Sequence, residues 1–273
     1  MAWFDRDAVG DRSRGLLAGL RVLSFGAFVA GNTAGLVLAE LGADVVKLES
    51  LRRPEALRSY FSLDHGEIYE PSGIRTTALW SGYARSTRSL CINMDAEEGR
   101  SLFRELVGQA DVVIENLGPG QMERWGSDYP ALAATNPTVV MAAISGYGRT
   151  GPRASYRSYG SNICNYLGLT SAWSVEGTHF DFVAGYHAAS AILSALHAVA
   201  ETGRGVYIDV SQAETGAAVM APLYMDALNG GPDWGFPPNT SPGSLLSTVL
   251  ACRGDDEWAA VDKIGRASCR ERV

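Results

Sequence analysis

Lysine is nearly absent from this chain of 273 residues: it occurs only at Lys47 and Lys263, so arginine carries almost all of the positive charge. The net charge is −7 at pH 7, which is the wrong sign for a nucleic-acid-binding surface. No two cysteines have the spacing of a zinc site or a redox motif; they are Cys91, Cys164, Cys252 and Cys269. These absences favour a protein with idle thiols in a reducing cytosol and no nucleic-acid partner.

Segments that would export or anchor the chain are also missing. The first fifteen residues, MAWFDRDAVGDRSRG, are charged and lack the apolar core of a signal peptide. No uninterrupted apolar stretch reaches the roughly 18 residues that a membrane helix needs. With 46% apolar and 19% charged residues, the composition is that of an ordinary soluble globular protein. We therefore expect a cytoplasmic protein with no membrane partner.

The common nucleotide and catalytic motifs are not found either. The first glycine-rich turn does not have the G-x-G-x-x-G spacing, and neither G-x-x-x-x-G-K-[ST] nor G-x-S-x-G occurs. The histidines make no metal-binding pattern; they are His65, His179, His187 and His197. His187 and His197 are ten residues apart on one expected helix, about 80° apart around its axis, so they need not converge. No metal site is expected.

Short apolar segments alternate with helical patterns along most of the chain. This alternation predicts an α/β fold with a doubly wound, mostly parallel sheet. The expected strands are 21–25, 44–48, 89–93, 112–114, 138–144 and 206–210. The expected helices run from Asn32 or Thr33 to 42, from a capping box at Asp95 to 109, from Asp181 to a C-cap at Gly203, and from a second capping box at Ser211 to 228.

The domain organisation follows from changes in composition. Residues 1–228 are expected to form a large domain that is incomplete here, and residues 229–263 a linker and the start of a smaller second domain. The linker is 230–247, rich in Pro, Gly and Ser, and 248–261 predicts a hairpin with its turn at Gly254-Asp255. Residues 51–82 show no clear period. The tail 264–273, IGRASCRERV, back-translates into a common sequencing adapter, so we expect a truncated natural protein followed by an artefact.

Three glycine-rich segments follow predicted strands, at 26–31, 116–120 and 146–151. In an open parallel sheet such turns meet at the carboxyl edge, where ligands bind. Glycine lets the backbone approach a ligand closely, and helix N-termini favour phosphate. Tight turns without a ligand are the alternative for any one of them, but three at one edge predict a nucleotide-like ligand.

Several ordered segments together resemble the family III CoA-transferases, the CaiB/BaiF group that includes formyl-CoA transferase, carnitine CoA-transferase and alpha-methylacyl-CoA racemase. They are LAGLRVLSFGAFVAG, LAELGADVVKLE, RSLCINMDAEEGR, ADVVIENLGPGQMERWG, NPTVVMAAISGYGRTGP, DFVAGYHAASAILSAL, TGRGVYIDVSQAE and CRGDDEWAAV. The resemblance implies a Rossmann-like CoA-binding large domain, a smaller second domain, coenzyme A or acyl-CoA as substrate, and a homodimer of interlocked chains.

The resemblance also implies roles for particular residues. The nucleophile of the family corresponds to Asp181, in a D-x-x-x-G pattern that ends at Gly185; its alternative role is a helix N-cap. The expected CoA contacts are Phe28, Val29, Ala30, Ile92, Asn116, Arg124, Trp125 and Tyr147. Arg124 suits a phosphate and Trp125 could lie against the adenine, although Arg124 could also be a solvated surface charge.

Some positions depart from the family pattern. The usual A-G-P of the first turn is Ala30-Gly31-Asn32, a Lys is replaced by Thr87, and a basic CoA contact falls on Asp95. The lost charge could come from Arg52, Arg53, Arg85 or Arg88. In the racemase branch a catalytic His occupies the position of Asn162, whose amide cannot shuttle a proton.

Three functions follow in order of preference. The first is a CoA-transferase that moves CoA from an acyl-CoA to a carboxylic acid through an aspartyl anhydride and thioester at Asp181. The second is a 2-methylacyl-CoA racemase or epimerase, and the third an inactive CoA-binding fragment. Four side chains could line an acyl pocket or simply pack in the core: Tyr159, Asn162, Tyr166 and Trp173. We expect a chain cut near residue 263 to be poorly stable.

Overall fold

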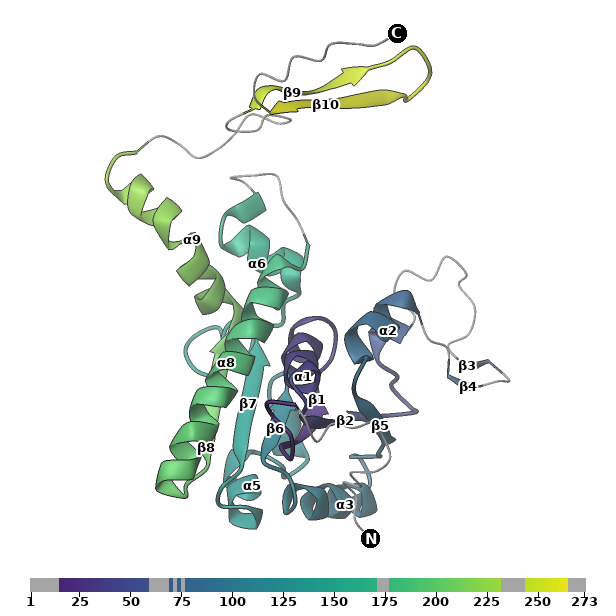
Figure 1. Cartoon of the computed structure of the whole chain (residues 1–273), viewed down its shortest axis with the longest axis vertical. Coiled ribbons are helices and arrows are strands. Elements are labelled where there is room, and N and C mark those ends of the chain that lie inside the picture. The colour runs from purple at the N-terminus through teal and green to yellow at the C-terminus, as the bar shows by residue number, and fades with distance from the viewer. Residues whose placement is uncertain are drawn as a thin grey trace.

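Six parallel strands form the central sheet of the computed structural model, which describes residues 15–58, 69–70, 73–74, 77–170, 177–231 and 244–264 (Figure 1). The strand order is β5-β2-β1-β6-β7-β8. The strands are β1 (Arg21–Phe25), β2 (Asp44–Glu49), β5 (Arg88–Cys91), β6 (Val112–Glu115), β7 (Val140–Ser145) and β8 (Val206–Ser211). This arrangement confirms the predicted α/β fold with a doubly wound parallel sheet, and its strand order is that of a Rossmann fold.

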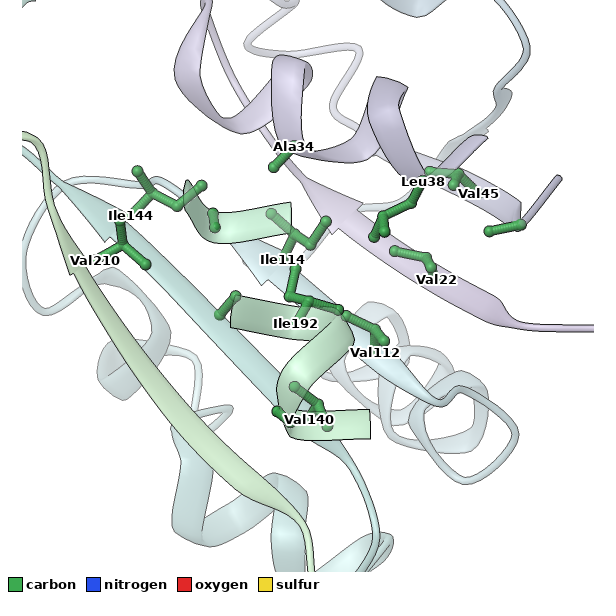
Figure 2. Packing of buried hydrophobic residues seen from close by; sticks show 14 of the residues in the cluster. Val22, Ala34, Leu38, Val45, Val112, Ile114, Val140, Ile144, Ile192 and Val210 are labelled. Atoms are coloured by element: carbon green, nitrogen blue, oxygen red, sulfur yellow. The ribbon is translucent and has the colours of Figure 1, made fainter. Parts of the chain in front are cut away.

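Helices cover both faces of this sheet, which explains why the central strands read as apolar runs rather than as alternating patterns. Helices α1 (Ala30–Glu40) and α8 (His179–Thr202) cover one face, where Leu38 and Ile192 pack against Val22, Val112 and Val140 (Figure 2). On the other face lie α3 (Glu97–Val107) and α5 (Tyr129–Thr135). The larger side chains of that second layer are Leu23, Phe103, Leu106, Val113, Leu132 and Met141.

Shorter elements surround the sheet. They are the 3₁₀ turn η2 (Ala56–Arg58), the two-residue strands β3 (Tyr69–Glu70) and β4 (Gly73–Ile74), and the helices α2 (Ala78–Ala84), α4 (Gln121–Arg124) and α6 (Gly160–Tyr166). The helix α9 (Gln212–Leu228) follows β8, and a third apolar cluster joins α6, α8 and α9 around Ile163, Phe180 and Met220. An antiparallel hairpin of β9 (Ser244–Ala251) and β10 (Trp258–Ile264) lies beyond the far end of α9 (Figure 1).

The predicted strands and long helices are confirmed to within a few residues, but three helix starts were wrong, including that of α8, which begins at His179 rather than at Asp181. Helix α1 begins at Ala30, not at Asn32 or Thr33. Helix α3 begins at Glu97, and its N-cap residue, Ala96, makes no side-chain hydrogen bond to the helix. The Asp95 carboxylate instead accepts a hydrogen bond from the Trp125 indole (3.1 Å), so the expected capping box does not form. The structure adds α2, α5 and α6, which lack a long apolar period.

At the other termini the expected caps are present. Gly203 ends α8 in the left-handed conformation, and the Ser211 hydroxyl caps α9 by accepting a hydrogen bond from the Glu214 amide (3.2 Å). The hairpin is also confirmed, although β9 begins at Ser244, inside the expected linker. Residues 232–243 and 265–273 lie outside the described part of the chain, so the second domain and the foreign tail stay predictions.

Strand order places the three glycine-rich turns side by side. The chain passes from β1 to β2 and β5 on one side of the sheet, and from β6 to β7 and β8 on the other. The point where this direction reverses lies between β1 and β6, and all strands are parallel. The turns after β1, β6 and β7 therefore leave the same edge from adjacent strands, which is the expected position of a ligand crevice.

Helix α8 is long and apolar enough, by length and composition alone, to cross a membrane. In this structure it packs on the sheet: Ala184, Ala188 and Ile192 are buried in the same cluster as the strands. The core of the α/β fold thus accounts for part of its apolar character, since 33% of its most apolar window is buried.

Candidate functional site

The turn after β1 is held in place by a side chain from the neighbouring turn. The Asn116 amide bonds to both backbone groups of Ala27, accepting from its N–H (2.5 Å) and donating to its carbonyl (2.7 Å). This pairing joins the ends of β1 and β6 across the reversal point. Asn116, expected as a CoA contact, therefore shapes the wall of the crevice, and its direct contact with CoA stays a prediction.

A buried polar network supports the same turn from beneath. The ammonium of Lys47, in the middle of β2, donates to the Asn32 side chain (2.6 Å), to Glu55 (3.1 Å) and to the carbonyl of Gly26. Burial lowers the pKa of Lys47, and the adjacent Glu55 carboxylate opposes this effect. Asn32, which stands where the family pattern has proline, is a member of this network, so the departure has a structural role.

The network also fixes the backbone of Phe28. The Phe28 amide donates to Glu55 (2.9 Å), and the Asn32 amide donates to the Phe28 carbonyl. Phe28 adopts a φ of +50°, a left-handed conformation that a bulky side chain adopts only where its surroundings impose it. Its ring contacts the ring of Tyr159 edge-on (5.2 Å between centroids). The first turn is thus fixed on one side by β2 and reaches towards α6 on the other.

A cavity of about 220 Å³ opens at the carboxyl ends of β1, β2, β5 and β6. Two of the expected CoA contacts, Ile92 and Trp125, line it, together with the Gly26-Ala27 turn that Asn116 holds. Its remaining lining residues are Phe25, Lys47, Leu48, Glu49, Ser50, Arg53, Glu55, Asn93, Met94, Asp95, Leu117, Gly118 and Gln121. The position of this cavity agrees with the ligand edge predicted from the sequence.

The other expected contacts do not line this cavity. Arg124 is exposed and its guanidinium bonds to the Gln121 side chain. Tyr147 packs edge-on against Tyr156 and Tyr166, at 6.0 and 5.2 Å between ring centroids. Phe28, Val29 and Ala30 form the end of the turn and the start of α1. Their contact with CoA stays a prediction.

The four candidate replacements for the missing positive charge have different environments. Arg85 pairs with Glu40 (3.0 Å) and Arg88 pairs with Asp44, both on the side of the sheet next to α1 and β2. Arg52 is exposed outside the cavity lining, whereas Arg53 lines the cavity. Of the four, Arg53 is the one that lines the cavity.

Asp181 lies in the first turn of α8 and is 7% exposed. The N-cap of this helix is Thr178, so the alternative role of Asp181 as an N-cap is wrong. One carboxylate oxygen, Oδ1, accepts a hydrogen bond from the Gln212 amide (2.7 Å), and the other, Oδ2, is buried with no hydrogen-bond partner among the described residues. Burial raises the pKa of Asp181 to about 6, while the Gln212 bond and the residue's own amide act in the opposite direction.

Two glycines set the surroundings of this carboxylate. A Cβ on Gly185, one helical turn beyond Asp181, would lie 2.8 Å from the Ala30 carbonyl and 2.6 Å from Cβ of Thr33, so glycine lets α8 pack closely on α1. A Cβ on Gly160, the first residue of α6, would lie 2.2 Å from Asp181 Oδ2. The D-x-x-x-G pattern therefore has a physical reason: Gly185 holds Asp181 beside the first turn.

Asp181 and the cavity thus occupy one edge of the sheet. Gln212 directly follows β8, which places Asp181 at the carboxyl end of that strand, while the cavity lies at the ends of β1, β2, β5 and β6. Phe28 directly follows Ala27, which lines the cavity, and its contact residue Tyr159 directly precedes Gly160, which packs against Asp181. Oδ2 is covered by α6, so a substrate reaches it only when this cover moves or the carboxylate rotates.

We expect Gly160→Ala to destabilise the fold by about 1–3 kcal/mol, the usual cost of overpacking a closely packed site, and to disturb Asp181. The added methyl would overlap Asp181 Oδ2 and the Gly177 carbonyl, which lies 2.5 Å from its position. Urea denaturation measures the effect. The control is Gly82→Ala in α2, where nothing lies within 4 Å of the added methyl; there we expect a gain of up to about 1 kcal/mol. Equal effects of the two substitutions would contradict the close packing.

Several functional groups in this site were not singled out from the sequence. Gln212, Lys47 and Glu55 carry no motif, but Lys47 is an isolated charge within the apolar strand DVVKLE, and such a position signals a buried partner. Asn162, at the racemase His position, accepts a hydrogen bond from the Tyr159 amide (2.9 Å) and so caps α6. Within the described ranges no group of three potential metal ligands is found. His65, Trp173 and Cys269 lie outside them.

The comparisons with known proteins agree on one family. A sequence model of the family described as CoA-transferase family III matches residues 17–271. The succinyl-CoA–L-malate CoA-transferase alpha subunit of Chloroflexus aurantiacus is 34% identical over 71% of this chain and 46% of its own length. The succinate–glutarate CoA-transferase of Agrobacterium fabrum is 30% identical over 89% of this chain and 64% of its own length.

A solved structure gives the same result at the level of the fold. The crystal structure of a CaiB/BaiF family protein from Brucella suis superposes with a TM-score of 0.73 at 31% identity, covering 87% of this chain and 64% of the other. The chain therefore spans about half to two thirds of the length of these relatives. The match over nearly the whole chain, together with the parallel sheet and the crevice at its carboxyl edge, shows that this chain belongs to CoA-transferase family III.

Proposed function

We propose that this chain belongs to an enzyme that transfers CoA from an acyl-CoA to a carboxylic acid, with Asp181 as the nucleophile. The single observation that carries the proposal is the state of the Asp181 carboxylate. It is buried at the ligand edge of the sheet, one oxygen is held by an amide, and the other has no hydrogen-bond partner among the described residues. A carboxylate without a counter-ion keeps its electron pairs available for attack on a carbonyl carbon.

The cavity at the carboxyl ends of β1, β2, β5 and β6 is the proposed CoA site. Trp125 offers a ring for the adenine and Arg53 offers a charge for a phosphate, both at the rim of this cavity. The pantetheine arm would then follow the turn after β1, past Phe28 and Tyr159, towards Asp181. This path would bring the thioester, at the end of the arm, to Asp181, with the adenine at the other end of the same turn.

The reaction would proceed through two anhydrides and one thioester. An oxygen of Asp181 attacks the thioester carbonyl, the C–S bond breaks, and CoA thiolate leaves a mixed anhydride. The thiolate then attacks the Asp181 carbonyl carbon, and the donor acid departs with an oxygen that belonged to Asp181. The acceptor carboxylate displaces the thiolate to form a second anhydride. Attack of the thiolate on the acceptor carbonyl gives the new acyl-CoA and returns the Asp181 carboxylate.

The names of the relatives indicate which substrates to test. They include CoA-transferases for malate, citramalate, glutarate and oxalate, all of which are small dicarboxylic acids. We extend this class to the present chain as a proposal. Homodimer assembly and the need for no metal are part of the same proposal.

The experiment is a screen of acyl-CoA and acid pairs by mass spectrometry, using acceptor acids labelled with ¹⁸O in both carboxyl oxygens. New acyl-CoA and ¹⁸O in the peptide that contains Asp181 are the expected results, because each acceptor leaves one oxygen on the nucleophile. New acyl-CoA with an unlabelled Asp181 would exclude the anhydride route. Inversion at the carbon next to the thioester without any new acyl-CoA would indicate the racemase alternative.

The rate is expected to depend on pH through Asp181. Its pKa of about 6 means that the carboxylate is the main form above that pH and the neutral acid below it. Because the ionised form attacks, kcat/KM should fall about tenfold per pH unit below about pH 6 and be level above it. A pH profile between about 4.5 and 8 measures this limb. A level rate down to the usual range of an exposed aspartate would contradict the burial of the nucleophile.

A further inference from the structure

Gln212 occupies a buried position at the first turn of α9, directly after β8, and is 5% exposed. Its side chain is not used to cap the helix, because the Ser211 hydroxyl already bonds to the Glu214 amide. The next residue, Ala213, donates its backbone N–H to the carbonyl of Gly146 (2.9 Å), which ties this turn of α9 to the end of β7. The backbone around Gln212 is therefore fixed by two neighbouring strands.

From this fixed position the side chain reaches across to the start of α8. Nε2 of Gln212 donates to Oδ1 of Asp181 at 2.7 Å, the distance of a strong bond to a charged acceptor. Among the described residues, no other side chain donates a hydrogen bond to this carboxylate. An amide donor orients the carboxylate without bringing a positive charge, which would reduce its nucleophilicity.

We infer that Gln212 is a positioning residue: its side-chain amide holds the Asp181 carboxylate in the orientation and charge state in which it attacks the thioester. The kinetic consequence rests on the proposed function, whereas the contact itself does not. Two opposing effects meet at this carboxylate. Burial favours the neutral acid, and the amide bond favours the ionised form. Loss of the amide should therefore raise the pKa of Asp181 further.

Other groups around Asp181 do not provide the same effect. Tyr83 of α2 is a titratable neighbour whose pKa is raised, by its burial first and then by Asp181 and Tyr186. Cys164 of α6 directs its thiol to the Gly177 carbonyl (3.6 Å), and the side chains of His179 and Glu214, in the first turns of α8 and α9, are exposed. None of these groups is a cation placed against the carboxylate, and the amide of Gln212 is its specific partner.

The test compares Gln212→Leu with the control Gln109→Leu, a glutamine in the turn after α3 that lies away from both sites. The first readout is the titration of Asp181, measured by NMR on protein with ¹³C-labelled aspartate carboxyl groups. The signal of Asp181 is assigned as the one that is missing in Asp181→Asn. We expect the midpoint in Gln212→Leu to rise by about one pH unit or more above that of the wild type, as the loss of a bond to a charged acceptor requires. Gln109→Leu should leave it unchanged.

The second readout is kinetic. In Gln212→Leu the acid limb of the kcat/KM profile should move to higher pH together with the NMR midpoint. At neutral pH, kcat should fall by about tenfold or more, and KM for the acyl-CoA should change little. The last expectation follows because Gln212 does not line the cavity. A merely structural role would lower stability without moving the midpoint or the limb, and that result would overturn the inference.

Gln212→Glu provides a variant of nearly the same shape if the leucine variant fails to fold. Its carboxyl group would share one proton with Asp181, so the pair should titrate in two steps and the rate should also fall at high pH, where both are ionised. A single acid limb like that of the wild type would count against the contact. If Asp181→Asn instead keeps full activity, the proposed function fails, while the NMR titration still decides the role of Gln212.

Discussion

Asp181→Asn is expected to reduce CoA transfer by roughly 10⁴-fold or more, the scale of loss when an enzyme loses its covalent nucleophile. The substitution keeps the shape of the side chain and an oxygen that can accept the bond from Gln212. It removes the charge and the electron pairs that form the anhydride. Initial rates of acyl-CoA formation measure the effect, and Asp255→Asn, an exposed residue in the β9–β10 turn, is the control. Activity within tenfold of the wild type would exclude Asp181 as the nucleophile.

The same variant tests the electrostatic state of the carboxyl group without any substrate. The pKa of Asp181 is raised from 3.8 to about 6 in the folded protein, so its contribution to stability is fully present below about pH 3.8 and is lost as the pH rises through about 6. Relative to Asp181→Asn, the wild type should therefore lose about 3 kcal/mol of unfolding free energy between about pH 4 and pH 7. Urea denaturation of both proteins across this range measures the difference. A constant difference would contradict the buried, ionised carboxylate.

Glu55→Ala is expected to have the largest effect on stability, a loss of about 3–5 kcal/mol, as is usual when one partner of a buried ion pair is removed. Lys47 would lose its ion-pair partner while staying buried among Trp80, Asn32 and the Gly26 carbonyl, and the hydrogen bond from the Phe28 amide to Glu55 would be lost. Because Phe28 is held in a left-handed conformation, the turn between the cavity and Asp181 should loosen as well.

The matched control for that variant is Glu40→Ala, which removes an exposed ion pair with Arg85 and should cost at most about 1 kcal/mol. Chemical denaturation measures both variants. The affinity of Glu55→Ala for CoA, measured by isothermal titration calorimetry, should fall, since the turn lines the cavity. Similar losses of stability in the two variants would show that the network beneath the turn is not held as the structure indicates.

Apolar periodicity was sufficient to predict the sheet, because its four central strands are buried on both faces and stand out as runs such as VVIE and VVMAAI. It failed for short elements whose burial comes from tertiary contacts. Helix α6 begins at Gly160, where the Tyr159 amide donates a hydrogen bond to the Asn162 side chain, and no local apolar stripe marks it. Likewise, Asp95 resembles the start of a capping box, but its carboxylate bonds to Trp125, thirty residues later in the chain.

The site shows the same division between local and distant information. The turns after β1, β6 and β7 could be placed at one edge from the strand pattern, and the resemblance to a family singled out Asp181. The partners of these groups come from distant segments: Gln212 reaches Asp181 from a helix 31 residues later, and Asn116 reaches Ala27 over 89 residues. Such pairings become visible only when strand order is known, because β6 and β8 must first be placed relative to β1.

The most direct test of the central claim is to trap the covalent intermediate. The protein is incubated with a reactive acyl-CoA in the absence of acceptor acid, treated with hydroxylamine, and digested for mass spectrometry. We expect a CoA thioester on the peptide that contains Asp181, its conversion to a hydroxamate at that residue, and neither product in Asp181→Asn. A hydroxamate at another carboxylate, or acyl-CoA turnover with no adduct at Asp181, would contradict the assignment of Asp181 as the residue that carries CoA between the two acids.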